Sequence, residues 1–280
     1  MEILSEMLQR LELSRWYKEI EPISLNSIRL INRKLNKEET LELGNSKFGG
    51  SPDLPANLTW PMYKERPLAF LAQIRLEDVV SFDIEGLLPS SGLLYFFYDA
   101  EQEPWGFEPA ARDGWKVLYS KELSRIIRTS PPPYSSKVFE GSYNPCAIEF
   151  FQEISLPSWE AEKVQKLALT EQERENYFQL VSHGIIHRLL GHPATIQGEM
   201  EIVCQFASNG IYMPNGIDYN ELKMVNLRDS ASEWKLLLQI DSDENVDFYW
   251  GQGGRLYFWI RKEALKNHIF DNVWLVGQCT

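Results

Sequence analysis

The stretch Phe70-Leu71-Ala72-Gln73-Ile74, followed by Gly92-Leu93-Leu94-Tyr95-Phe96-Phe97, decides the fold of this chain, because it occurs in two versions. The second version reads Leu236-Leu237-Leu238-Gln239-Ile240, followed by Gly254-Arg255-Leu256-Tyr257-Phe258-Trp259. Each version is an apolar run as long as a buried strand, then a glycine and a second such run. The repeat predicts two related strand pairs. Each pair has a face that it cannot bury alone, so the two are expected to pack together.

The flanks of the two versions also match. Gly50-Ser51-Pro52 precedes the first and Gly191-His192-Pro193 precedes the second. We therefore expect two pseudo-repeated halves, at about 48–120 and 190–277, joined through a proline-rich segment near 130–134. Most links between the expected strands are too short for helical crossovers. The predicted fold class is α+β with mainly antiparallel sheets, in a single compact domain that spans residues 1–280.

An N-terminal helix and a central helix are predicted beside the sheets. Residues 1–19 place apolar side chains at helical spacing, including Ile3 and Leu8. Thr170 and Glu173 have the spacing of a capping box, which predicts the start of a helix that runs to about residue 190. The apolar stripe of this second helix is expected to contain Phe178, Val181, Ile185 and Leu189. Short strands are expected near 200–206 and 211–213.

Composition bounds the class of protein. The net charge of −12 repels phosphate backbones and anionic lipids, so neither nucleic acid nor a membrane is expected as a partner. Cys146, Cys204 and Cys279 have no C-x-x-C spacing, which argues against a disulfide framework or a zinc ribbon. No apolar run approaches the ~18 residues of a membrane span. These features predict a cytoplasmic protein without a cofactor.

Ordered motifs link the chain to a known family. They lie at residues 46–55, 60–61, 67–74, 87–99, 187–198, 236–243 and 250–260. Together they resemble the YwqG-like family of bacterial proteins, a domain-of-unknown-function family, over roughly residues 46 to 280. The resemblance implies an intracellular two-fold α+β fold and no established reaction. Gln252 follows Trp250-Gly251 where the family pattern has an acidic residue, which puts a cation-binding role at that position in doubt.

Gln73 and Gln239 occupy equivalent places in the two apolar runs. A polar side chain inside such a strand is costly unless it is paired, by roughly 1–3 kcal/mol. One interpretation is that each amide ties its strand to the neighbouring Gly-x-Pro loop. The other is a polar ligand-binding cleft between the halves, to which the loop-flanking aromatics Trp60 and Trp250 would contribute.

The acidic loop Asp241–Asp247 is a second candidate for chemistry. Asp241 and Asp243 alternate like the first ligands of a calcium loop, but the sixth and twelfth positions are Val246 and Gln252. We therefore expect no metal here, and a solvated hairpin whose Asp side chains cap backbone N–H groups. On this interpretation Asp241→Asn changes stability by less than about 1 kcal/mol.

Histidines provide the remaining candidates. His183 and His187 would lie on one face of the predicted central helix, but the H-E-x-x-H pattern of a zinc hydrolase is absent. Chance spacing, with His187 hydrogen-bonded in the core, is favoured over a metal site. His192, in the second Gly-x-Pro loop, is included among the candidate ligand-binding residues.

The sequence thus favours a cytosolic binding or protein-interaction protein, with a polar and aromatic cleft between two related halves. Its partner would be a protein or a small polar ligand. A protein of the immunity type, which neutralises a basic toxin, fits the acidic charge because complementary charge speeds association. The alternative is a metal-assisted hydrolase that uses the acidic loop Asp241–Asp247.

Overall fold

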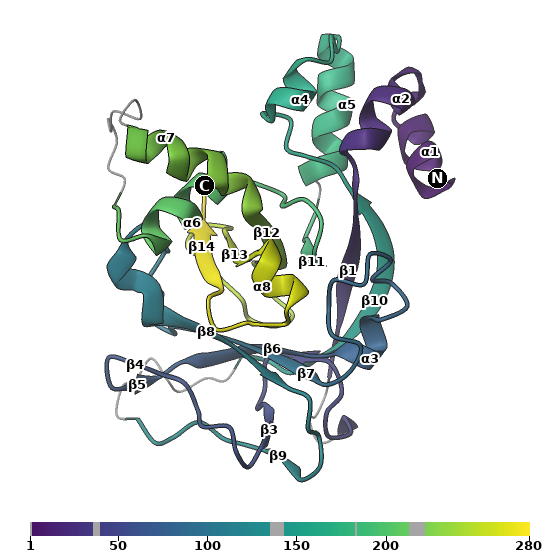
Figure 1. The fold of residues 1–280 in the computed structure, drawn as a ribbon. Helices are drawn as coiled ribbons and strands as arrows, with labels where there is room; N and C mark the ends of the chain where they lie inside the picture. The colour runs from purple at the N-terminus through teal and green to yellow at the C-terminus, as the bar shows by residue number, and fades with distance from the viewer. Residues whose placement is uncertain (1, 36–39, 135–142, 183, 213–221) are drawn as a thin grey trace.

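The computed structural model describes residues 2–35, 40–134, 143–182, 184–212 and 222–280. It contains helices and one large antiparallel sheet that curls until it is nearly barrel-shaped (Figure 1). This confirms the α+β class with mainly antiparallel sheet. No helix in the described ranges is long and apolar enough to cross a membrane.

The large sheet has ten strands. From one edge to the other they are β14 (Trp274–Gln278), β13 (Arg255–Arg261), β12 (Trp234–Asp241), β11 (His187–Leu189), β1 (Leu25–Lys34), β10 (Cys146–Ser155), β2 (Lys47–Phe48), β6 (Ala69–Arg75), β7 (Leu93–Tyr98) and β8 (Trp115–Ser120). Two small sheets pair β3 (Asp53–Pro55) with β9 (Ile126–Arg128) and β4 (Met62–Tyr63) with β5 (Arg66–Pro67).

The helices are short. They are α1 (Glu2–Arg10), α2 (Tyr17–Ile20), α3 (Leu76–Val79), α4 (Glu162–Gln165), α5 (Glu171–Ser182), α6 (Glu201–Ser208), α7 (Leu222–Asp229) and α8 (Lys262–Lys266). Short 3₁₀ segments are η1 (Ser14–Trp16), η2 (Glu21–Ile23), η4 (Pro109–Gly114) and η6 (Ser230–Glu233).

The order of strands reads alike from both edges. β1 and β10 pair at the centre, from Leu25 with Ser155 to Lys34 with Cys146. On each side follow one short strand and a meander of three strands, β6–β7–β8 or β12–β13–β14. Each meander has a bulge in its first strand, between Phe70 and Ala72 in one and between Leu236 and Leu238 in the other.

The curl of the sheet brings the two meanders face to face. Phe96 of β7 packs edge-on against Phe258 of β13, with ring centroids 5.2 Å apart. At the sheet edges the Trp115 indole donates to the Val273 carbonyl (2.9 Å). The Gly277 N–H donates to Trp105 O at 3.0 Å, in the loop that follows β7. One apolar core therefore joins residues of both meanders.

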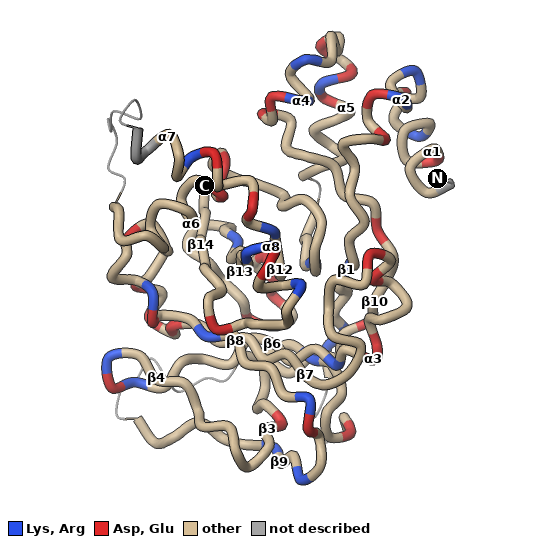
Figure 2. Tube along the Cα trace, viewed as in Figure 1, with Lys and Arg blue, Asp and Glu red and all other residues tan. Residues whose placement is uncertain are grey.

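A helical lobe lies at one end of the long central strands. It consists of α1, η1, α2 and η2 before β1, and of α4 and α5 after β10 (Figure 1). Its own core contains Leu4, Leu8, Leu13, Ile20, Leu156, Val164 and Tyr177. Acidic and basic residues are interspersed along this lobe (Figure 2).

The N-terminal helix is shorter than predicted. α1 ends at Arg10, because Glu12 has a positive φ of 57° and Leu13 N bonds back to Leu8 O at 2.8 Å. Ile3, expected on the buried stripe, is 39% exposed, whereas Leu4 is buried.

The central helix also ends early. The capping box is confirmed, since Thr170 N donates to Glu173 Oε2 (2.9 Å) and Glu173 N to Thr170 Oγ1 (3.3 Å). However, α5 ends at Ser182, and the predicted last turn is instead strand β11. The predicted stripe is wrong, because Phe178 and Ile185 are exposed while Glu173 and Tyr177 are buried.

The strand predicted near 200–206 is wrong, because those residues belong to helix α6. Its face of Cys204 and Ala207 packs into the main core, and this helical periodicity decides the structure. Residues 211–212 form neither helix nor strand, and residue 213 lies outside the described residues.

Candidate functional site

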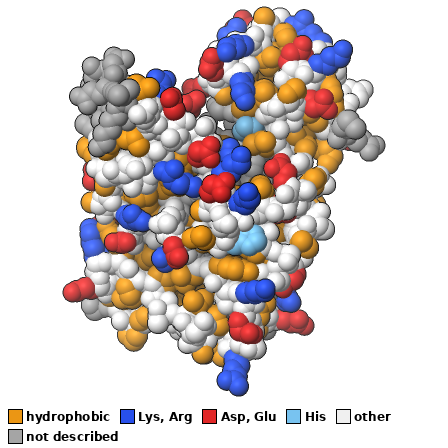
Figure 3. Space-filling view, in the orientation of Figure 1, with side chains coloured by type: hydrophobic (Ala, Val, Ile, Leu, Met, Phe, Trp, Pro, Cys, Tyr) orange, Lys and Arg blue, Asp and Glu red, His pale blue; other side chains and the backbone are white. Residues whose placement is uncertain are grey.

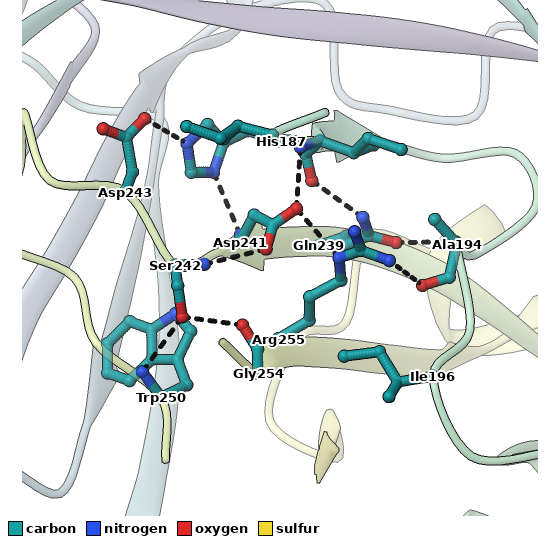
Figure 4. Close-up of polar contacts among 12 residues, drawn as sticks. His187, Ala194, Ile196, Gln239, Asp241, Ser242, Asp243, Trp250, Gly254 and Arg255 are labelled. Atoms are coloured by element: carbon teal, nitrogen blue, oxygen red, sulfur yellow. Dashed lines mark hydrogen bonds and ion pairs between the residues drawn. The ribbon is translucent and has the colours of Figure 1, made fainter. Parts of the chain in front are cut away.

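Gln73 and Gln239 tie their strands to loops, as one interpretation of the sequence predicted. Gln239 Oε1 accepts from Ala194 N (2.8 Å), and its Nε2 donates to Ile186 O at 2.7 Å (Figure 4). Gln73 Oε1 accepts from Asp53 N (2.8 Å), and its Nε2 donates to Asn45 O at 2.8 Å. Both glutamines are fully buried, so in this structure they serve the loops.

Two tyrosines hold the same loops, which the sequence reasoning missed. The Tyr95 hydroxyl donates to Asp53 O at 2.7 Å and the Tyr257 hydroxyl to Ala194 O at 2.6 Å. Burial raises the pKa of both phenols, so they remain protonated donors. The available signal was the third position after Gly92 and Gly254, which is tyrosine in both versions of the repeat.

Asp241 is buried, which corrects the prediction of a solvated loop. Its Oδ2 accepts from Ile186 N and from Arg255 Nε, both at 2.8 Å, and Oδ1 accepts from Ser242 N at 2.9 Å (Figure 4). The Asp241 and Arg255 side chains are 7% and 11% exposed. The Asp side chain does cap backbone N–H groups as expected, but it does so inside the protein.

Asp243 is buried as well and faces a histidine. His187 Nδ1 accepts from Asp241 N at 3.1 Å, so the ring proton lies on Nε2, which donates to Asp243 Oδ2 at 3.1 Å. Asp243 also accepts from the Asn32 side chain and from Asn245 N. Although burial raises the pKa of Asp243, the bonds from His187, Asn245 and Asn32 outweigh it, and the net pKa is lowered.

These contacts remove the basis of the two metal interpretations. His187 lies in β11 rather than on a helix, and His183 lies outside the described residues. Asp241 and Asp243, the carboxylates that the hydrolase alternative would use, are both buried and engaged in hydrogen bonds within the chain. Among the described residues there is no group of three or more His, Cys, Asp or Glu side chains that could hold a metal ion.

The two predicted tryptophans lie apart from each other. Trp250 is fully buried and packs on Tyr98 and Phe248. Its indole N–H has no hydrogen-bond partner in the part of the chain that the structure describes. The Trp60 indole donates to Leu68 O at 2.9 Å, in the apolar cluster on the outer side of β6 and β7. Trp60 and Trp250 therefore do not form one aromatic cleft.

His192 is the predicted site residue that borders an open cavity. We call this cavity the junction pocket. It has a volume of about 330 Å³. Its lining residues are Ile23, Pro157, Ser158, Glu160, Ala161, Glu162, Lys163, His192, Pro193, Thr195, Gly198, Glu199 and Glu201. Figure 3 shows the surface hollowed where the helical lobe meets the rest of the molecule.

Larger hollows, of about 490 and 770 Å³, lie beside β4–β5 and between α1 and α5, but neither contains a predicted site residue.

The buried network shapes one wall of the junction pocket, the loop 191–200. Besides Gln239 and Tyr257, Arg255 holds this loop by donating to Ala194 O at 2.9 Å. Gln278 Oε1 accepts from Ile196 N at 2.9 Å and from Gln197 N at 3.0 Å. Gln239 and His192 thus meet at this loop, and Asp241 reaches it through Arg255, whereas Gln73 binds Asn45 and Asp53 instead.

Acceptors and negative charge dominate the junction pocket. Four glutamates line it, against the single lysine Lys163. Burial, above all, and the neighbouring Glu199 raise the pKa of Glu201, and they outweigh the opposite effects of backbone N–H groups and Lys235. Burial lowers the pKa of His192 to about 4, so its ring is neutral at pH 7. Glu199 and Glu201 could not be singled out from the sequence, because carboxylates are common in this acidic chain.

Comparison with known families gives one match. A family model described as Domain of unknown function (DUF1963) matches residues 46–279. The matched range contains β2 to β14 and leaves out α1, α2 and β1. Among curated proteins the comparison finds no match.

Proposed function

We propose, from the premise that this chain belongs to the DUF1963 family, that it is a binding protein whose ligand enters the junction pocket. The family is one of unknown function, and the support for a binding role comes from the pocket itself. The observation that supports this proposal is an open cavity whose lining contains four glutamates and one lysine. Glu160, Glu162 and Glu199 are exposed, and Glu162 pairs with Lys166. The remaining surplus of carboxylates over cations favours a ligand with a positive charge.

The partner that fits this pocket is a basic segment of another protein. The chain carries a net charge of −12, which attracts a basic partner over a distance and speeds association. A cytoplasmic, immunity-type protein that neutralises a basic toxin is the version that we propose. Within the family, the sequence motifs favour a YwqG-like member. The hydrolase alternative has no supporting observation, because the carboxylates on which it rested are buried in hydrogen bonds.

We also propose that the two halves derive from a duplication and form one compact domain. In support, Gln73 and Gln239 each bind the residue after the proline of a Gly-x-Pro loop. The hydroxyls of Tyr95 and Tyr257 bind the carbonyls of those same residues. On this proposal the cavity is not a symmetric cleft between halves, since one of its walls comes from the helical lobe.

Peptide binding tests the proposed function. Labelled ten-residue peptides of Gly and Ser that carry two arginines, two glutamates or no charge are titrated by fluorescence anisotropy. We expect selective binding of the arginine peptide that weakens with salt. The variant E199Q/E201Q should lower the affinity about tenfold, as loss of charge-assisted contacts does. The matched variant E108Q/E244Q, with two exposed carboxylates outside the pocket, should not. Equal binding by both variants, or no preference for arginine, contradicts the proposal.

A further inference from the structure

The segment before residue 46 lies outside the family match, yet it belongs to the structure and to the pocket. β1 pairs with β10 on one side and with β11 on the other, so it closes the centre of the large sheet. Immediately before β1, Ile23 lines the junction pocket. The pocket is therefore composite, because the family-matched residues supply only part of its wall.

The helical lobe fixes where Ile23 lies. Arg15 forms a two-pronged ion pair with Glu173 of α5, with both N–O distances at 2.6 Å. The Trp16 indole donates to the same carboxylate at 3.1 Å. Ile20 is fully buried in the core of the lobe, three residues before Ile23. The segment 14–23 thus has one defined position in the helical lobe, whose residues 157–163 carry the neighbouring part of the wall.

His192 joins that segment to the opposite wall. Its Nε2–H donates to Ile23 O at 2.8 Å, since a carbonyl can only accept. Its backbone N–H donates to Ser155 Oγ (2.9 Å), and its carbonyl accepts from Arg188 at 2.7 Å. His192 is therefore held at three points: its ring, its backbone N–H and its carbonyl. Its hydrogen bond to Ile23 connects the lobe with the loop 191–200 across the pocket.

The lining also has two chemically distinct parts. Ile23, Pro157 and Pro193 offer apolar surface, and Glu199 and Glu201 offer carboxylates. An aliphatic stem that ends in a cation satisfies both, and this is the form of an arginine or lysine side chain. Such a ligand contacts the Ile23 side and the acidic side at once, so the distance between the two walls affects its affinity.

We propose that segment 14–23 is a specificity wall of the junction pocket, and that His192 is the positioning residue that sets its distance from the acidic wall. This rests on the proposed function. On this proposal the pocket takes one arginine or lysine side chain of a partner protein. The aliphatic stem of that side chain lies against Ile23, and its cation points toward Glu199 and Glu201. Binding is expected to depend on the aliphatic stem as well as on the charge.

Variants of His192 in the full-length chain test the proposal, with the two-arginine peptide and guanidinium chloride as probes. His192→Gln keeps a donor for Ile23 O, and His192→Leu does not. We expect H192L to weaken the peptide about tenfold, the equivalent of one hydrogen bond. H192Q should stay near the wild type. Free guanidinium, which has no stem, should bind weakly and equally to all three. His268→Leu is the matched control, because His268 is exposed and outside the pocket.

The outcomes separate this inference from the proposed function. If E199Q/E201Q weakens the peptide while H192L and H192Q both bind like the wild type, the pocket is the site and the specificity wall is refuted. Loss of binding in H192Q as severe as in H192L also refutes it, because the donor then does not matter. If the wild type binds no arginine peptide, the proposed function itself fails. Rescue by H192Q alone supports the positioning role.

Discussion

Gln73 and Gln239 each lie opposite a tyrosine in the next strand, Tyr95 and Tyr257 respectively. On their other side they lie opposite a basic residue, Lys47 and Arg188. A row of cation, amide and phenol therefore crosses each half of the sheet. In both rows the amide and the phenol hold one loop residue, which explains how a polar row persists among buried apolar strands.

Replacing Gln239 with Leu should destabilise the protein strongly. The variant leaves Ala194 N and Ile186 O buried without a partner, and each orphaned group costs about 1–3 kcal/mol. We expect the free energy of unfolding in urea to fall by about 2–4 kcal/mol. Gln152→Leu, at an exposed position of β10, is the control and should change it by less than about 0.5 kcal/mol. A neutral Gln239→Leu would mean that the loop does not depend on this amide.

Asp241→Asn should now be severe rather than neutral. Removing the charge leaves the guanidinium of Arg255 largely buried without its counter-ion. Breaking such a pair from one side costs about 3–5 kcal/mol, and the amide oxygen of Asn recovers part of this. We expect a loss of about 3 kcal/mol in urea unfolding. Asp247→Asn, an exposed change in the same loop, should have almost no effect. Equal stability of the two variants would contradict the buried ion pair.

The error about Asp241 has a physical cause. A dense acidic stretch looks solvated when only its neighbours in sequence are known. The groups that satisfy it come from far along the chain: Ile186 N lies 55 residues away, and Asn32 reaches Asp243 across 211 residues. Such partners leave no local signal. The partners of Gln239 are equally far along the chain, but here the repeat supplied the signal: an amide at the same point of each apolar run, and a Gly-x-Pro loop before each, predicted the contact between them.

The strands, too, differ in whether their local sequence is enough to predict them. The strands around Gln73 and Gln239 were predictable from unbroken apolar runs bounded by glycine. The residues of β11 were not, because three residues are too few to show a period, and they follow a genuine helix start at Thr170. Ile28, Leu30 and Ile31 predict a strand at residues 27–33, which is β1, but its place at the centre of the sheet depends on pairing with β10, more than a hundred residues later.

Acid should weaken the helical lobe through Glu173. Hydrogen bonds from Arg15, first, and from Thr170 N lower the pKa of Glu173 to about 2, from an ordinary 4.5. Because the folded pKa lies below the unfolded one, the stabilisation is complete above about pH 4.5 and is lost as the pH falls toward 2. Wild type should therefore melt at a higher temperature than Glu173→Gln at pH 7, and the gap should close by pH 2. A gap that is constant with pH would contradict the ion pair with Arg15.

The last prediction concerns separate halves. We expect the fragments 1–129 and 134–280 each to lack a cooperative thermal transition. The first fragment contains β1 but neither of its neighbours, β10 and β11, and the second contains both neighbours without β1. Each fragment also exposes a face that the other covers, since Phe96 packs on Phe258 and Trp115 on Trp274.

The same geometry predicts that the two fragments, when co-expressed, associate and recover a single melting transition, because β1 can then insert between its partners. Measurement is by circular dichroism on each purified fragment and on the co-purified pair. A sharp transition in either fragment alone would show that the halves are independent, and failure of the pair to associate would show that the chain connection itself is needed.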